Sequence, residues 1–323
     1  MTTPARGTIA VLGATGRLGG ATARHLLEDG WSVRAITRKP DGPKARALAA
    51  AGAQVVKADM EDPAALRKAF EGAQGVFNVQ NPMKSGLEAE VRQGRNVADA
   101  AADAGARHVV YGSAGVGRSG TGVGQWESKL RVKEHMLTRG LPLTVLRPMA
   151  LMELMTDKDF YPALSTWNTM PALAGPDTKI VWLAADDLGA IAAKAFADRD
   201  GFVGRDVALA SDVRSIAECR ELYRAAAGRP PRSFPVPVWM FERMAGKDLT
   251  AMWRWPRTAE LDLDVTPTLA IHPGAMTVER WLLRRFSKDG GARTAEAQGA
   301  RAAARLTTST PIAQERPSDH PPA

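Results

Sequence analysis

Thr8-Ile-Ala-Val-Leu-Gly-Ala-Thr-Gly-Arg-Leu-Gly-Gly20 is the stretch that decides the fold of this chain. It opens with a short apolar run, places glycines at Gly13, Gly16 and Gly19, and continues into Ala21 to Leu27, where the pattern predicts a helix. The order is therefore strand, tight turn and helix. Because a helix N-terminus offers unpaired N–H groups and the positive end of its dipole to an anion, this order predicts a phosphate site.

Each glycine of the motif has a separate task in a dinucleotide site. Gly13 allows the sharp turn, Gly16 lets the backbone approach a pyrophosphate, and Gly19 lets the helix pack on the strand. The spacing is G-x-x-G-x-x-G, and the alternative is a purely structural glycine turn. A second strand at Ser32 to Thr37 favours the dinucleotide. The candidate cofactor-binding residues here are Gly13, Ala14, Thr15, Gly16, Arg17, Leu18 and Gly19.

Two cations follow the second predicted strand, where a Rossmann domain meets the adenosine ribose. An acidic residue at this point favours a free 2′-hydroxyl, but this chain has Arg38 and Lys39. Cations suit a 2′-phosphate, which an arginine grips in a forked geometry. The alternative is a solvated basic loop. We expect the cofactor to be NADP(H) rather than NAD(H), with Arg38 at the phosphate.

Strands and helices alternate through the first half of the chain. After the first strand, strands are predicted at residues 32–37, 54–59, 75–80, 107–113 and 141–148, with helical patterns between them. Such alternation forms parallel β-α-β units with right-handed crossovers. The predicted fold class is α/β, a doubly wound parallel sheet of the Rossmann type.

Several polar residues fall at the carboxyl ends of these strands, where ligands of open α/β sheets gather. Asp59 ends the third strand and is a candidate contact for the adenine end of a cofactor; the alternative is a helix cap, for which Asp62 is better placed. Asn78 ends the fourth strand, near the expected nicotinamide-side ribose. Ser113 ends the fifth strand, and the segment from Ala114 to Gly124 that follows it holds five glycines.

The chain is expected to divide into a Rossmann core at residues 1–150 and a smaller α/β substrate-side part at 151–288, partly interleaved with the core. Asp186-Asp187 is expected to cap a helix at Leu188 to Ala197. Residues 289–323 have almost nothing apolar to bury and predict a disordered tail. A further apolar set is interpreted as core, or alternatively as the lining of a pocket for a flat substrate: Met149, Met152, Met155, Trp167 and Met170.

Composition narrows the function classes. One cysteine among 323 residues excludes an internal disulfide and a cysteine-based metal cluster, and the histidines show no metal-ligand spacing. The net charge of +8 is spread along the chain rather than gathered in a block, which disfavours nucleic acid as a partner. No apolar segment has the length of a signal peptide or a membrane span, so a cytoplasmic location is expected.

Together these features resemble the NmrA-like branch of the atypical short-chain dehydrogenase/reductases, across roughly Thr8 to Ser287. The matching pieces are Gly13-Ala-Thr-Gly-Arg-Leu-Gly19, Arg38, Ala58-Asp59, Tyr111-Gly-Ser-Ala114, Lys129 followed by Glu134, and Leu141-Pro-Leu-Thr-Val-Leu-Arg-Pro148. The resemblance implies either an NADPH-dependent reductase, of quinones or azo compounds among others, or a redox sensor that binds the dinucleotide and regulates a partner. It also implies that Lys129 contacts the nicotinamide ribose; the alternative is an exposed helical lysine.

One position departs from the family. In active short-chain dehydrogenases a tyrosine four positions before the lysine donates a proton to the carbonyl, whereas this chain has Gln125, which has no acidic proton to give. Ser113 is retained, but serine alone is a poor general acid at neutral pH. Ordinary ketone reduction and sugar-nucleotide epimerisation are therefore disfavoured.

A quinone avoids this difficulty, because solvent can protonate the hydroquinone anion that hydride transfer leaves. The sequence thus favours an NADPH-dependent oxidoreductase that acts on a quinone-like or other conjugated small molecule, with Lys129 and Ser113 as catalytic residues. The alternative is a non-catalytic NADP(H)-sensing regulator that binds a protein partner. The glycine-rich segment serves either function, as a substrate lid or as a ligand-ordered switch.

Overall fold

The computed structural model describes residues 6–157, 159–160, 165–258 and 261–287. Its main sheet confirms the predicted doubly wound α/β fold, because seven parallel strands run in the order β3-β2-β1-β4-β5-β6-β9. The strand order reverses between β1 and β4, which is the crevice where open α/β sheets bind ligands. The strands are β1 Arg6–Val11, β2 Trp31–Thr37, β3 Gln54–Lys57, β4 Gly75–Asn78, β5 His108–Gly112, β6 Leu143–Pro148 and β9 Asp206–Leu209.

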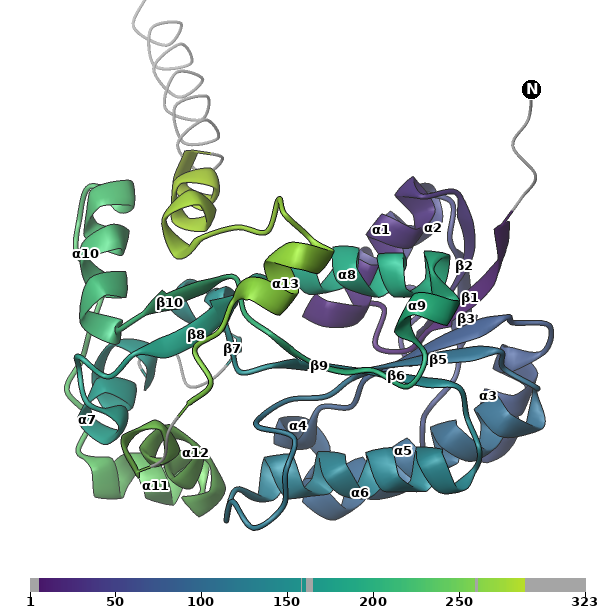
Figure 1. Cartoon of the computed structure of the whole chain (residues 1–323), viewed down its shortest axis with the longest axis horizontal. Coiled ribbons are helices and arrows are strands. Elements are labelled where there is room, and N and C mark those ends of the chain that lie inside the picture. The colour runs from purple at the N-terminus through teal and green to yellow at the C-terminus, as the bar shows by residue number, and fades with distance from the viewer. Residues whose placement is uncertain (1–5, 158, 161–164, 259–260, 288–323) are drawn as a thin grey trace, which may run out of the picture.

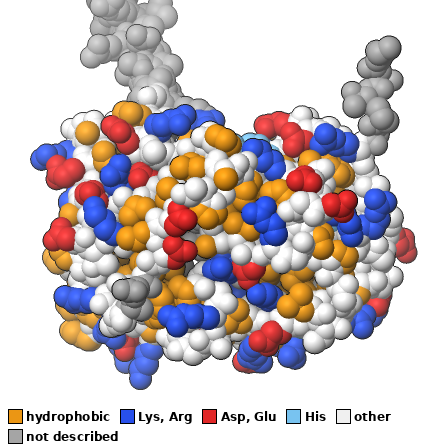
Figure 2. Space-filling model, viewed as in Figure 1, with side chains coloured by type: hydrophobic (Ala, Val, Ile, Leu, Met, Phe, Trp, Pro, Cys, Tyr) orange, Lys and Arg blue, Asp and Glu red, His pale blue; other side chains and the backbone are white. Residues whose placement is uncertain are grey.

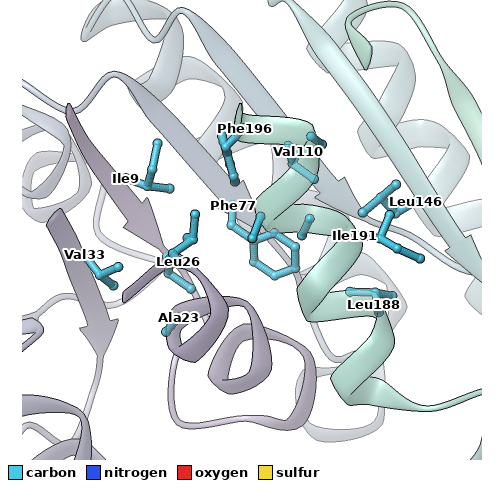
Figure 3. Close-up of a cluster of buried hydrophobic side chains, with 14 of the residues drawn as sticks. Ile9, Ala23, Leu26, Val33, Phe77, Val110, Leu146, Leu188, Ile191 and Phe196 are labelled. Carbon is cyan, nitrogen blue, oxygen red and sulfur yellow. The ribbon is translucent and has the colours of Figure 1, made fainter. Parts of the chain in front are cut away.

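Helices cover both faces of this sheet (Figure 1). One layer holds α1 Arg17–Glu28, α2 Pro43–Ala50 and α8 Ala185–Ala197, and the other holds α3 Pro63–Phe70, α5 Leu87–Asp103 and α6 Gly124–Thr138. Strand side chains such as Ile9 and Phe77 pack against Leu26 of α1 and Ile191 of α8 (Figure 3). These two buried layers fix the carboxyl edge of the sheet on which the candidate site is built.

The second half of the chain forms a smaller part around a three-stranded sheet, β10-β8-β7. Its elements are β7 Ala150–Leu151, η1 Met152–Met155, η2 Ser165–Thr169, α7 Met170–Ala174, β8 Ile180–Leu183, β10 Asp212–Arg214, α10 Ile216–Ala227, α11 Val238–Ala245, α12 Lys247–Thr258 and a helix at residues 278–287. Four members of the apolar set, Met152, Met155, Trp167 and Met170, are buried in its core, so their core interpretation is confirmed. The remaining elements of the described residues are the short helices α4 Pro82–Ser85, α9 Arg199–Phe202 and α13 Thr266–Ile271.

Two predicted helix caps have opposite outcomes. Asp62 caps α3 as expected, because its Oδ1 accepts from Ala64 N and Ala65 N at 3.0 Å each. The prediction that Asp186-Asp187 caps α8 was wrong, because the helix begins at Ala185 and both aspartates lie inside its first turn. Their carboxylates instead make tertiary contacts, such as Asp187 Oδ2 with Met276 N at 2.9 Å.

Surface features place few further limits on function. Basic and acidic side chains are interspersed over the face shown in Figure 2. Among the described residues, no helix combines the length and apolarity that a bilayer crossing requires, and no group of three or more potential ligands is arranged to hold a metal. The predicted tail at 289–323 lies outside the described residues.

Candidate functional site

The glycine turn joins β1 to α1 beside the crevice of the sheet. Gly13 has a φ of +61°, which favours glycine, and its carbonyl accepts from Gly16 N at 2.7 Å. Gly16 is the N-cap of α1, so no N-cap side chain accepts a hydrogen bond from the first N–H groups of the helix. The first turn of α1 also holds no acidic residue. The start of α1 therefore offers free N–H groups and the positive end of the dipole to an anion.

Gly19 has no room for a side chain. A Cβ atom there would lie 2.4 Å from the carbonyl oxygen of Gly13 and 2.5 Å from that of Leu12. Both are backbone atoms of the turn, so they have little freedom to move. The helix begins at Arg17, earlier than the predicted Ala21, and the last three residues of the motif therefore lie in its first turn. This close approach of helix and turn is the geometry expected of a dinucleotide cradle.

A groove of about 530 Å³ lies where the turn meets α1, α2 and the helix at 278–287. Leu18 does not line it but packs against the core beneath α1. Arg17 is held by two carboxylates, with its Nε 2.8 Å from Asp157 Oδ2 and its Nη2 2.6 Å from Asp159 Oδ1. Arg17 would have to exchange these partners to contact a diphosphate. The predicted cofactor residues that line the groove are Ala14, Thr15, Gly16 and Arg17.

Glu153 lines the same groove and titrates near neutral pH. Its two carboxylate oxygens accept from Ala185 N, at 3.1 and 3.2 Å, at the start of α8. Burial raises the pKa of Glu153 to about 7, while the backbone donors and Arg17 act in the opposite direction.

The adenosine end of the expected site carries unpaired cations. Arg38 and Lys39 follow β2 and are exposed, and neither side chain has a hydrogen bond or ion pair with the part of the chain that the structure describes. Asp59 follows β3, and its Oδ1 accepts from Glu61 N at 3.1 Å. Two free cations thus lie at the end of β2, where a 2′-phosphate is expected.

Two buried amides at the end of β4 are incompletely satisfied. Gln80 Nε2 donates to Asn78 Oδ1, but Asn78 Nδ2 and Gln80 Oε1 are buried without a hydrogen-bond partner among the described residues. Such orphaned groups are uncommon in folded proteins. Asn78 ends β4 and Gln80 follows it, at the carboxyl edge of the sheet where ligands of this fold gather. Either side chain would have to turn toward that edge before its free group could contact a dinucleotide.

Lys129 is buried rather than exposed, which excludes the interpretation of a solvated helical lysine. It lies on α6, and its Nζ donates to Glu90 Oε1 of α5 at 2.6 Å. The other oxygen of Glu90 accepts from Ser128 Oγ at 2.5 Å. Ser113, at the end of β5, is also buried. Two residues before it, Tyr111 has a pKa well above the usual value, raised by burial first and then by Glu90, and lowered by Ser113.

Gln125 occupies the helix start four positions before Lys129. A carboxylate from the smaller part reaches this point, because Asp248 of α12 accepts from Gly124 N and, at 3.2 Å, from Gln125 N. The side-chain Nε2 of Gln125 lies 3.5 Å from Met83 Sδ, so it has no strong acceptor there. Nothing at this position donates an acidic proton.

An aromatic cluster lies next to Gln125. The rings of Trp126 on α6 and Trp255 on α12 pack edge to face with centroids 5.2 Å apart. Gly115 lies against the Trp126 ring, where a Cβ atom would come within 2.5 Å of Cγ. The glycine-rich segment after β5 is therefore packed on this cluster, with Met149 partly buried beside it.

Sequence reasoning missed two residues that hold α6 in place, Glu90 and Asp248. The signal for Glu90 was available in part: it shares a buried helix face with Val91, Gly94 and Val97, where an acidic residue requires a partner. Asp248 had no such signal, because it lies 124 residues from Gly124. Whether the predicted cofactor residues bind a dinucleotide stays a prediction.

Comparison with known proteins gives consistent matches over most of the chain. Residues 5–282 match the family model described as the NmrA-like family. The NmrA-like family domain-containing oxidoreductase FrzB of Cladobotryum sp is 33% identical over 258 residues, which cover 72% of this chain and 77% of that protein.

Two solved structures share the fold. One is NmrA, a negative transcriptional regulator, in complex with NAD; it has a TM-score of 0.71 and 22% identity, with 90% of this chain and 98% of that chain covered. The other is the NADPH-dependent quinone oxidoreductase QOR2 from Escherichia coli, complexed with NADPH; it has a TM-score of 0.65 and 23% identity, with coverage of 86% and 99%.

Proposed function

Because the chain belongs to the NmrA-like family, we propose that it is an NADPH-dependent oxidoreductase that transfers hydride to a quinone-like or other conjugated small acceptor. One observation carries this proposal: the glycine turn, closed to side chains at Gly19, occurs together with a buried lysine, Lys129, in the helix that follows β5. The first suits a diphosphate, and the second suits the hydroxyls of a ribose.

The residues present suit an acceptor that needs no placed acid. When bound, NADPH supplies a hydride, which reduces a quinone by two electrons to the hydroquinone monoanion. Solvent provides the remaining proton, so Gln125 is no obstacle. In this proposal Lys129 holds the nicotinamide ribose, and the Ser113 hydroxyl donates a hydrogen bond to the acceptor oxygen as negative charge develops. The protein otherwise has to orient two rings and exclude water.

The relatives support a reductase without identifying its acceptor. FrzB is named as an oxidoreductase, and QOR2 is named as an NADPH-dependent quinone oxidoreductase. The NmrA structure, named as a negative transcriptional regulator, supports the second candidate, a non-catalytic NADP(H)-sensing regulator with a protein partner. The glutamine at position 125 favours this alternative. Binding of NADPH without turnover of any acceptor would distinguish the regulator from the enzyme.

Arg38→Ala is expected to weaken NADPH binding about ten- to a hundredfold, since it removes a charged hydrogen bond to the 2′-phosphate. NADH binding should change little, because NADH lacks that phosphate. Titration of both dinucleotides by fluorescence measures the ratio. Lys68→Ala, which removes an exposed lysine from α3, is the matched control and should leave both affinities unchanged. An unaltered NADPH to NADH ratio in Arg38→Ala would remove the basis for the NADP preference.

A further inference from the structure

We infer that Glu90 is the positioning residue of the site: its carboxylate supplies the counter-charge of Lys129 and fixes it in place, so that the remaining N–H groups of the ammonium serve the cofactor ribose. The inference rests on the proposed function, because it requires that Lys129 face a bound dinucleotide.

Both hydrogen bonds that the Glu90 carboxylate accepts within the described residues come from α6. Its side chain is fully buried, and that of Lys129 is 8% exposed, so both charges are withdrawn from water. One carboxylate oxygen binds Lys129 Nζ and the other binds Ser128 Oγ. A buried ion pair of this kind is weak evidence for stability, because the cost of desolvation offsets much of the attraction. A role in orienting the lysine is therefore a better account of its presence.

The two helices are built to bring the pair together. One turn beyond Glu90, a Cβ atom on Gly94 of α5 would lie 2.4 Å from a methyl group of Val132 on α6. This glycine allows the helix axes to approach closely, so the short glutamate side chain reaches Lys129. Glu90 also lies in the first turn of α5, where the helix dipole favours a carboxylate.

The further ionisable groups on neighbouring elements include a neutral phenol and groups that are already paired. Tyr111 of β5 is neutral, since burial first and the Glu90 carboxylate second raise its pKa. Asp248 of α12 is bound to the start of α6, and on the solvent side Arg131 is paired with Glu88. One ammonium N–H is used by Glu90, which leaves two donors for ribose hydroxyls. An ammonium that is buried without its counter-charge gives up its proton more readily as pH rises.

The test is the affinity for NADPH between about pH 6 and about pH 9, measured by fluorescence for wild type, Glu90→Gln and Glu88→Gln. Glu88→Gln is the matched control, because it removes an exposed carboxylate that pairs with α6 from the same helix. Wild type and control should have parallel profiles. At the acid end of this range Glu90→Gln should bind NADPH nearly as well as wild type does. At the alkaline end it should lose about tenfold more affinity than wild type, the effect expected from the loss of one charged hydrogen bond.

Two further variants separate positioning from folding. Adding Lys129→Arg to Glu90→Gln should flatten the profile, because a guanidinium stays charged throughout. If Glu90→Gln does not fold, Glu90→Asp should show a smaller loss in the same direction. A Glu90 variant that folds and has the wild-type profile would overturn the role of Glu90. Failure of the wild type to bind NADPH would instead contradict the proposed function.

Discussion

Gly19→Ala is expected to destabilise the folded protein by about 3 kcal/mol and to abolish NADPH binding. The added Cβ atom would lie 2.4 Å from the Gly13 carbonyl oxygen, so α1 would have to move away from the turn. That movement would displace the N–H groups to which the proposal assigns the diphosphate. Urea denaturation measures the first effect, and fluorescence titration with NADPH measures the second.

Gly20→Ala, one position along the same helix, is the control for Gly19. Its Cβ atom would lie 3.0 Å from the Ala14 carbonyl oxygen, a contact that needs a shift of only a few tenths of an ångström. The higher helix propensity of alanine, worth up to about 1 kcal/mol, works in its favour. We expect this variant to stay folded and to bind NADPH. Equal stability of the two variants would contradict the close-packed turn.

Lys129→Met is expected to lower the free energy of unfolding by about 3–5 kcal/mol, because it leaves the Glu90 carboxylate buried without a counter-charge. It should also remove the ribose contact and weaken NADPH binding. Urea denaturation and titration report these two effects separately. Lys133→Met, one turn along α6, is the matched control, since its partly exposed pair with Asp206 is worth about 1 kcal/mol or less.

The double variant Lys129→Met with Glu90→Leu separates the two effects. With both charges removed, the core should recover most of its stability, because apolar side chains often replace a buried ion pair without loss. NADPH affinity should not recover, because no donor for the ribose returns. Recovery of binding together with stability would show that Lys129 has only a structural task.

Local signals were sufficient to predict the fold. The glycine motif and the alternation of strands and helices gave the parallel sheet, and Asp62 capped α3 because its partners lie two and three residues away. The cap at Asp186-Asp187 failed for the opposite reason. The first N–H of α8 donates to Glu153, which lies 32 residues earlier in the chain. The capping propensity of Asp186 and Asp187 gives no information about such a distant contact.

The same limit applies to the site. Sequence reasoning placed Arg38, Ser113 and Lys129 at strand ends or on a helix, because a parallel sheet gathers such positions at one edge. It did not predict that Glu90 binds Lys129, since that contact depends on how closely α5 and α6 pack. The exposed or buried state of Lys129 likewise followed only from the packed helices.

The most direct test of the proposed activity is NADPH oxidation by the wild-type protein, followed by absorbance against a panel of small quinones. We expect NADPH to be consumed with at least one quinone, in a one-to-one ratio to the hydroquinone formed, and Lys129→Met to remove this activity. Tight binding of NADPH without oxidation by any member of the panel would contradict the reductase and favour the NADP(H)-sensing regulator.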